Sequence, residues 1–228
     1  MRERMARVVI FGCGRGADTA FRYLSRDTDH EICAFTVDAA HLDSREFHGR
    51  PVVEYDAIES RYPPAEYQMF VPLGFQGMNR VRAERYLDAK RRGYRFISYV
   101  HSRHYSLEGV RVGENCFILD SQIFNLDVTI GDNVTIWSGN HIGDRTVVGN
   151  HVWISSHVTL AGDVVVGDYC FLGVNSCVSN QVQLGARTFV GANVLIGQST
   201  PEGSVYVAPP VKPMPITSER FLAMLKIT

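Results

Sequence analysis

Apolar side chains recur at every sixth position over the second half of the chain, from Val112 to Ile196. Fourteen of the 15 residues in this column are aliphatic and one is aromatic. A helix has a period of about 3.6 residues and a strand one of about 2, so neither produces this repeat. The members of the column are Val112, Ile118, Phe124, Ile130, Ile136, Ile142, Val148, Ile154, Leu160, Val166, Leu172, Val178, Leu184, Val190 and Ile196.

A fixed period of six predicts a parallel β-helix, in which each hexad is one short strand plus a turn. Three hexads make one triangular coil, so 15 hexads predict five stacked coils with the column in the interior. Glycine follows the column residue in nine hexads, and we expect it to supply corner conformations, often with positive φ, that a Cβ would penalise. These glycines are Gly113, Gly131, Gly143, Gly149, Gly167, Gly173, Gly185, Gly191 and Gly197.

The first half of the chain alternates between short apolar segments and helical patterns, which predicts a small parallel α/β sheet. Residues 39–66 are rich in turn formers, and residues 101–111 are expected to connect the sheet to the β-helix. After residue 200 the repeat stops, and an extended proline-rich tail leads to a short helix at Ser218–Leu225. The expected strands are Arg7–Gly12, His30–Asp38, Met69–Leu73 and Arg95–Val100, and the expected helices are 17–26 and Arg80–Arg92. We therefore expect three parts: an α/β domain at 1–106, a β-helix at 107–201, and the tail with its helix at 202–228.

A glycine-rich turn, Gly14-Arg15-Gly16, lies between the first expected strand and the first expected helix. This order is typical of a nucleotide-binding βαβ unit, where a phosphate binds at the helix N-terminus. Glycine turns of this kind also occur without a ligand. Asp38 lies 26 residues beyond Gly12, which is farther than the usual spacing of about 20 in dinucleotide folds, so a nicotinamide cofactor is disfavoured.

Composition narrows the class of protein. Lys and Arg number 23 against 24 Asp and Glu, for a net charge of −1 without a basic stripe, which disfavours nucleic acid as a partner. No apolar run reaches about 18 residues, so we expect no membrane span. The N-terminus leads into the first strand and does not resemble a signal peptide. Five cysteines with no CxxC pair indicate a reduced, cytoplasmic protein.

The combined motifs resemble bacterial sugar acyltransferases, including sialic acid O-acetyltransferases and GDP-perosamine N-acetyltransferases. The resemblance rests on the glycine-rich βαβ unit, the hexads, the stretches 137–143 and 171–175, and the tail motif Val-Tyr-x-x-Pro-Pro-x-Lys at 205–212. It implies a left-handed β-helix homotrimer that uses acetyl-CoA in a cleft between subunits. The N-terminal domain would hold a nucleotide-linked sugar.

On the substrate side, the resemblance implies that Gly14, Arg15 and Gly16 face the nucleotide diphosphate. Asp38 would contact the base or the ribose. Relatives often have His where this chain has Arg15, and an arginine can grip a diphosphate with two hydrogen bonds. The alternative is that Arg15 is an ordinary surface residue of a tight turn.

On the acyl-donor side, the resemblance implies that the backbone N–H of Gly162 meets the thioester carbonyl, as an oxyanion-type donor. Trp153, Val174 and Ala192 would line the CoA arm, and Lys212 would meet a CoA phosphate; the alternatives are a turn glycine and a solvated lysine. Trp153, Phe171 and Phe189 are 18 residues apart, so they stack as an aromatic column. Because such a column is rarely left in water, a trimer contact is favoured over a cofactor site.

The general base of these relatives is a His two residues after a column residue, a position that Asp144 occupies here. A free Asp is a far weaker base than His at neutral pH. Three accounts stay open: Asp144 is a base with a raised pKa, His141 acts instead, or the amine enters neutral and needs no base. The alternative is that Asp144 is an ordinary corner residue without a catalytic role, because Gly-Asp recurs at the same position of other hexads. No histidine spacing indicates a metal site.

The function that follows is acetyl transfer from acetyl-CoA to the amino group of a nucleotide-linked 4-amino-4,6-dideoxy sugar, for O-antigen or another surface glycan. N-acylation is favoured because an amine remains nucleophilic beside a weak base. Two alternatives remain: a non-catalytic nucleotide-sugar-binding trimer that has lost its His, and an O-acetyltransferase on a related sugar.

Overall fold

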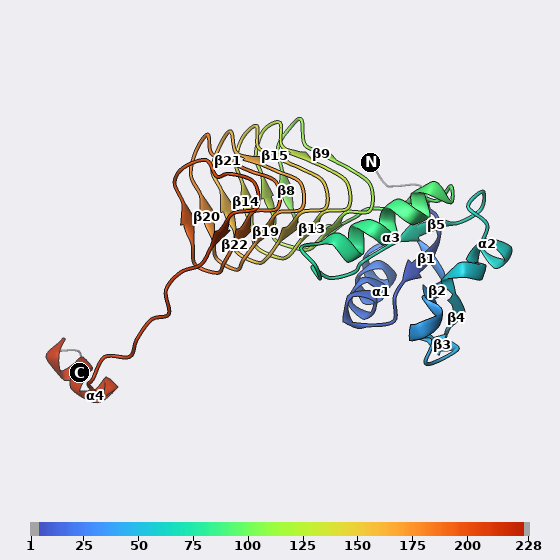
Figure 1. The fold of residues 1–228 in the computed structure, drawn as a ribbon, viewed down its shortest axis with the longest axis horizontal. Coiled ribbons are helices and arrows are strands. Elements are labelled where there is room, and N and C mark those ends of the chain that lie inside the picture. Colours follow the sequence, from blue (N-terminus) through green and yellow to red (C-terminus); the bar gives the residue numbers. More distant parts are fainter. Residues whose placement is uncertain (1–4, 226–228) are drawn as a thin grey trace.

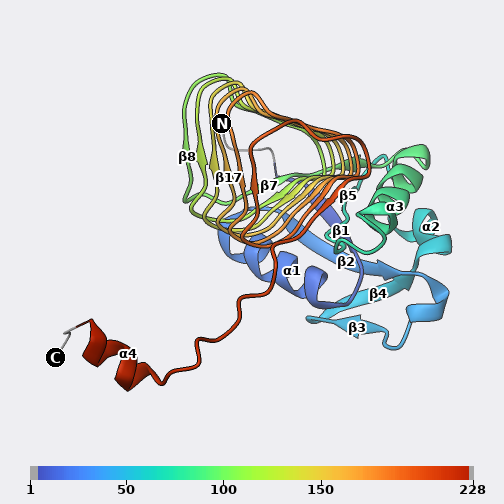
Figure 2. The same ribbon diagram turned by 60° about the vertical axis from the view of Figure 1, so that its left-hand side comes forward.

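The computed structural model describes residues 5–225. An α/β part formed by the first half of the chain lies against one side of a β-helix, and the C-terminal tail projects away from both (Figure 1). A view turned by 60° shows the triangular outline of the stacked coils (Figure 2). No helix within residues 5–225 has the length and apolar character that a membrane crossing requires. The expected combination of a small α/β sheet and a β-helix is confirmed.

The α/β part is a six-stranded sheet in the order β3-β4-β2-β1-β5-β6, parallel except for the β3–β4 hairpin. Helix α1 packs on one face with Ala17, Ala20 and Leu24, and α3 packs on the other with Tyr86 and Ala89. The strands are β1 Arg7–Phe11, β2 Glu31–Val37, β3 Glu46–Phe47, β4 Arg50–Glu54, β5 Gln68–Phe70 and β6 Arg95–Phe96. The helices are α1 Arg15–Asp27, η1 Ala39–His41, η2 Tyr55–Ala57, α2 Ile58–Arg61 and α3 Arg80–Arg91.

The β-helix has three flat faces of two-residue parallel strands. Face one comprises β7 Tyr99–Val100, β10 Phe117–Ile118, β13 Thr135–Ile136, β16 Trp153–Ile154, β19 Phe171–Leu172, β22 Phe189–Val190 and β24 Val205–Tyr206. Face two comprises β8 Tyr105–Ser106, β11 Ile123–Phe124, β14 His141–Ile142, β17 Thr159–Leu160, β20 Cys177–Val178 and β23 Leu195–Ile196. Face three comprises β9 Arg111–Val112, β12 Thr129–Ile130, β15 Val147–Val148, β18 Val165–Val166 and β21 Gln183–Leu184.

The first coil begins at Tyr99, before the start of the column at Val112. Strand β7 pairs with β10, and β8 pairs with β11, so residues 101–111 form part of a coil and are not a connection. The expected strand Arg95–Val100 is therefore split between the α/β sheet and face one. Its continuation was hidden because Ser106, a polar residue, occupies the column position of β8. We propose to place the boundary between the two parts at β6–β7.

The corner glycines have a different role from the one expected. None of the nine has positive φ; the left-handed residues lie two positions later, as at Asn133, Arg145 and His151. Glycine is required because the coils stack closely: a Cβ on Gly167 would lie 2.6 Å from the backbone nitrogen of Ala186. The corner between faces three and one has glycine in every coil, at Gly113, Gly131, Gly149, Gly167 and Gly185.

The aromatic column on face one is partly covered by another segment of the same chain. Phe75, from the segment before α3, packs on Trp153 and Phe171 with ring centroids 5.2 and 4.9 Å apart. Phe171 in turn stacks on Phe189 at 4.8 Å. Phe75 is a partner within the chain that sequence spacing could not show, because it lies 78 residues before Trp153. A trimer contact of the column stays a prediction.

The short C-terminal helix α4, Ser218–Met224, agrees with the expected range to within one residue. Its Thr217 cap accepts a hydrogen bond from the Arg220 backbone N–H at 3.3 Å. Figure 1 places α4 well clear of the β-helix, and its Phe221 and Met224 side chains are exposed. Its amphipathic pattern favours packing on the body or on a neighbour; it does not pack on its own body, and packing on a neighbour stays a prediction.

Substituting alanine for Gly167 should destabilise the fold by about 1–3 kcal/mol, because the new methyl group meets only backbone atoms of the next coil, which cannot move aside. Gly197 follows the column residue in the same way, but nothing lies within 4 Å of its Cβ position. Gly197→Ala is the matched control and should be neutral or stabilising by about 0.4–1 kcal/mol. Urea unfolding measures both, and equal effects of the two changes would contradict the close stacking.

His151 should make the stability depend on pH. Its ring is buried and its Nδ1 atom lies 2.8 Å from the Asn133 side-chain nitrogen. Burial and, after it, the charge of the nearby Arg82 lower the pKa of His151 to about 4, while Asp168 and Asp132 oppose the shift. Protonation therefore favours the unfolded chain, so the free energy of unfolding contributed by His151 falls as pH drops from about 6.5 toward 4, by at most about 1.4 kcal/mol per unit.

Urea unfolding of His151→Asn between pH 4.5 and 7.5 should show a shallower loss of stability on acidification than the parent chain. Asparagine suits the left-handed backbone of this position, where φ is 61°. His157→Asn is the control, because His157 is exposed and has a similar φ of 58°. An unchanged pH slope in His151→Asn would rule out this linkage.

Candidate functional site

A cavity of about 720 Å³ lies where the carboxyl ends of β1, β2 and β5 approach face one of the β-helix. This edge of a parallel sheet is where α/β folds bind ligands. The cavity is lined by the glycine turn, by Asp38 and Arg85, and by a floor that includes Trp137 and Trp153. The structure thus brings together all four residues expected on the substrate side, Gly14, Arg15, Gly16 and Asp38.

The glycine turn presents the N-terminus of α1 to the cavity. Gly14 is the N-cap and supplies no side-chain bond, so the first N–H groups of the helix are available to an anion. Gly12 has φ of +103°, which only glycine adopts readily. Gly16 allows a close approach, because a Cβ there would overlap the carbonyl oxygen of Pro72. Arg15 begins the helix and is exposed at the cavity.

Asp38 follows β2 and is ion-paired with Arg85 of α3, at 2.7 Å between Oδ2 and Nη2. The Arg85 guanidinium also lies 5.6 Å from the ring centroid of Phe11 and 5.7 Å from that of Tyr55. This pair fixes one carboxylate oxygen of Asp38. Sequence reasoning missed Arg85, since nothing in the spacing of 47 residues links α3 to the end of β2.

The floor of the cavity is aromatic. Trp137 and Trp153 belong to successive coils, with ring centroids separated by 6.0 Å, and Phe75 packs edge-on against Trp153. Trp153 was expected beside Val174 and Ala192, but the structure places it in the cavity with the glycine turn. Aromatic rings beside a polar turn suit a ligand with both an anionic and a planar or cyclic part.

The two candidate bases lie outside the cavity lining, on another side of the β-helix. His141 is half-buried on the outer side of face two, in β14. Asp144 follows at the corner between faces two and three, where its Oδ1 accepts a hydrogen bond from the Leu126 N–H at 3.1 Å. Gly162 occupies the same corner one coil later, and its N–H donates to Asn180 Oδ1 at 2.8 Å. The expected oxyanion donor is therefore engaged by a side chain.

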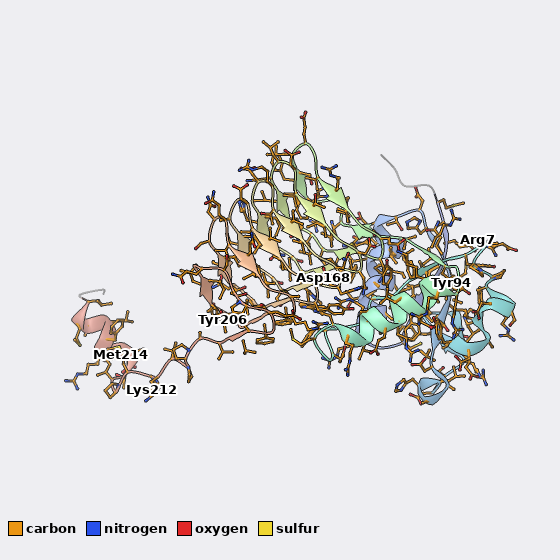
Figure 3. All side chains as sticks on the ribbon, turned by 45° about the horizontal axis from the view of Figure 1, so that its top comes forward. Arg7, Tyr94, Asp168, Tyr206, Lys212 and Met214 are labelled. Atoms are coloured by element: carbon orange, nitrogen blue, oxygen red, sulfur yellow. The ribbon has the colours of Figure 1, made fainter. Side chains whose placement is uncertain are left out.

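The remaining acyl-donor candidates are spread out. Val174 and Ala192 are exposed at the corner between faces one and two, one coil apart. Lys212 lies on the extended tail near Met214, away from the rest of the chain (Figure 3). The structure does not bring Trp153, Gly162, Val174, Ala192 and Lys212 together into one site within a protomer. Within residues 5–225, no three His, Cys, Asp or Glu side chains are grouped so as to hold a metal ion.

Two families of repeats match the β-helix. The family described as "Bacterial transferase hexapeptide (six repeats)" matches residues 145–180. The family described as "Hexapeptide repeat of succinyl-transferase" matches residues 163–198. No curated protein matches the chain. These matches, with the arrangement of the three faces, confirm the hexapeptide-repeat, left-handed β-helix class.

Among solved structures, the chain is similar to a mutant of perosamine N-acetyltransferase from Caulobacter crescentus in complex with CoA and GDP-perosamine, with 28% identity and a TM-score of 0.79. That match covers 92% of this chain and 97% of the other. PerB from the same organism, in complex with the same two molecules, is 27% identical with a TM-score of 0.77, over 89% and 94% of the two chains.

The acetyltransferase domain of PglB from Neisseria gonorrhoeae is 18% identical, with a TM-score of 0.78 and coverage of 91% and 99%, and shows a shared fold. The expected resemblance to sugar acetyltransferases is confirmed by the two Caulobacter structures, whose similarity spans both the α/β part and the β-helix.

Proposed function

We propose that this chain is an acetyl-CoA-dependent N-acetyltransferase that acts on the amino group of a nucleotide-linked 4-amino-4,6-dideoxy sugar in surface glycan biosynthesis. The observation that carries the proposal is the similarity, over both parts of the chain, to an N-acetyltransferase whose structure holds CoA and a nucleotide-linked amino sugar. The cavity beside the glycine turn supports it independently, because it joins an anion-binding helix N-terminus to an aromatic floor.

On the substrate side, the diphosphate would accept hydrogen bonds from the free N–H groups at the start of α1, where the helix dipole favours negative charge. Arg15 would add a charged donor at the mouth of the cavity. Asp38, with one oxygen held by Arg85, has its other oxygen left to accept from a ribose hydroxyl or a base N–H. The sugar would then extend toward the floor formed by Trp137 and Trp153.

The active unit is a homotrimer in this proposal, because the substrate cavity and the candidate bases lie on different sides of one protomer. A neighbouring copy can bring its Asp144 and His141 to the cavity. Face two, which carries His141, offers a surface for such packing, since its Tyr105, Ile123 and Leu195 are 60%, 42% and 70% exposed. We place the enzyme in the cytoplasm, where acetyl-CoA is available and its five free cysteines remain thiols.

In the reaction, the acceptor amine attacks the thioester carbonyl of acetyl-CoA. The new N–C bond forms, the C–S bond breaks, CoA leaves as the thiol, and the amine loses one proton. The Gly162 N–H would stabilise the oxyanion once Asn180 releases it. The proton would pass to Asp144, to His141, or to solvent if the amine enters neutral, and each of these routes remains part of the proposal.

The assay that tests the function is release of free CoA thiol with a panel of UDP-, GDP- and dTDP-linked 4-amino sugars. We expect turnover with at least one sugar, from a particle with three times the 25.5 kDa chain mass by light scattering. Tight binding of one nucleotide sugar without turnover would favour the non-catalytic binding trimer. Acetylation of a hydroxyl sugar in place of the amine would favour the O-acetyltransferase.

If Asp144 is the base, Asp144→Asn should lower kcat by roughly 10²–10⁴, since it keeps the shape and removes the basicity. The matched control is Asp168→Asn, because Asp168 also follows a corner glycine and accepts a backbone N–H, that of Asn150 at 2.7 Å. That change should leave kcat within about threefold, well below the range for a base.

The same kinetics with His141→Asn separate the three routes. A larger loss in His141→Asn than in Asp144→Asn would assign the base to His141. Losses below about tenfold in both variants would leave the neutral-amine route. Asp144→His should retain or raise activity, and its failure in a trimer that still binds CoA would contradict the placement of the chemistry at this corner.

A further inference from the structure

Arg82, in the first half of α3, is a buried arginine without a carboxylate partner. Its side chain is 1% exposed, and none of the ion pairs formed by residues 5–225 includes it. Burial lowers the pKa of its guanidinium to about 9, which still leaves it charged at neutral pH. A buried charge is costly unless hydrogen bonds compensate for its lost hydration, so the arrangement of those bonds decides what Arg82 does.

Three of these bonds reach the β-helix at the corner between faces three and one. Nε donates to the carbonyl of Asn133 at 3.3 Å, and Nη2 donates to the carbonyls of His151 and Val152 at 3.1 and 3.2 Å. Asn133 and His151 belong to successive coils and are the left-handed residues of this corner. Arg82 therefore binds the repeating backbone of two coils, a surface whose geometry the stacked strands hold rigid.

The other bonds reach the segment between β5 and α3. Nη1 donates to the carbonyls of Leu73 and Gly74 at 3.4 and 3.1 Å, and to the Asn79 side chain at 3.2 Å. The planar guanidinium thus connects this segment to the β-helix through a single group. A lysine has its donors on one nitrogen and cannot span the same acceptors.

The segment also carries backbone strain. Gly77, Met78 and Asn79 are consecutive left-handed residues, with φ of 60°, 55° and 65°. Glycine and asparagine tolerate this conformation, so the cost, roughly 1–2 kcal/mol, falls mainly on Met78, and the conformation persists where surrounding contacts over-determine it. The Asn79 side chain, fully buried, donates to the carbonyls of Tyr169 and Cys170 at 3.2 and 3.1 Å, in the next coil along.

The same segment forms one wall of the candidate site. Its Pro72 carbonyl lies directly against Gly16 of the glycine turn, where no Cβ fits between them. Its Phe75 packs on Trp153 of the floor. A shift of this wall would therefore move the α1 N-terminus relative to the β-helix, and the distance between these two elements sets the room available to a ligand.

We propose that Arg82 is a positioning residue that holds the segment 72–79, and through it the glycine turn, at a fixed separation from the β-helix floor. The expected effect of Arg82 on ligand binding rests on the proposed function, since the cavity is taken as the nucleotide-sugar site. Arg82 does not line the cavity. It acts through Leu73, Gly74 and Asn79, and its guanidinium carbon lies 5.6 Å from the ring centroid of Trp153 in the floor. Loss of the guanidinium fork should loosen the substrate end of the site and leave the acetyl-CoA end unaffected.

The first test needs no ligand. Hydrogen exchange of the whole purified chain should become faster in Arg82→Lys at segments 72–79 and 12–17, while β-helix amides at 135–196 keep the parent rates. Arg80→Lys is the matched control, because Arg80 lies on the same helix, is exposed, and among residues 5–225 forms an ion pair only with Glu84, at 3.5 Å. Unchanged exchange at 12–17 in Arg82→Lys, or a uniform rise over the whole chain, would overturn the proposal.

The second test is kinetic. Arg82→Lys should raise KM for the nucleotide sugar by about tenfold or more, the scale of one lost charged hydrogen bond, with KM for acetyl-CoA and kcat within about threefold. An equal change in both KM values would indicate a merely structural role and reject the proposal. Absence of turnover in the parent chain would reject the proposed function alone, because the exchange test still decides the role of Arg82.

If Arg82→Lys does not fold, Asn79→Gly provides the same test. Glycine accepts the left-handed backbone at this position and removes only the side-chain bonds to Arg82, Tyr169 and Cys170. It should raise exchange at 72–79 and 12–17 in the same pattern. Protection equal to that of the parent chain would show that the wall is held without this network.

Discussion

The hydrogen bonds between successive coils are the constraint on which the rest of the structure depends. The Trp153 N–H donates to the Cys170 carbonyl at 2.9 Å, and equivalent bonds repeat along all three faces. Parallel strands joined in this way lie about 4.8 Å apart, so every corner must fit within that spacing. The glycine at the corner between faces three and one follows from this, and so does the row of backbone carbonyls that Arg82 and Asn79 bind.

The β-helix was predictable because each hexad repeats the same local requirement. One apolar position in six must face inward, and the column from Ile118 to Ile196 is buried throughout. The reason for the corner glycines was not predictable in the same way, since it depends on the backbone of the neighbouring coil. The start of the β-helix was hidden because Ser106 replaces an apolar residue, and the β3–β4 hairpin was hidden within a turn-rich stretch.

The residues of the candidate site were likewise predictable only where they are close together in the sequence. The glycine turn and Asp38 could be named from sequence because strand, turn and helix follow one another directly. Arg85, Phe75 and Trp137 could not, because they reach the cavity only when α3 and the β-helix pack together. Asp144 and His141 lie on another side of the protomer, so one chain alone does not assemble the cavity and the bases into one centre. The separation between the cavity and the candidate bases is a property of the fold, since faces one and two point in different directions (Figure 2).

The end of the β-helix has a consequence for how copies of the chain associate. The last coil is irregular: face one ends in β24 and face two in β23, and face three continues past β21 only by a single bridge between Leu184 and Thr200. Beyond β24 the chain continues through Pro209 and Pro210, which have no N–H to offer a further strand, and then projects away from the coil. A uniform, flat end would invite stacking into fibres. The irregular end and the projecting tail hinder end-to-end stacking of two copies. Contact through the sides of the β-helix is then favoured, and such contacts lead to closed oligomers more readily than to filaments.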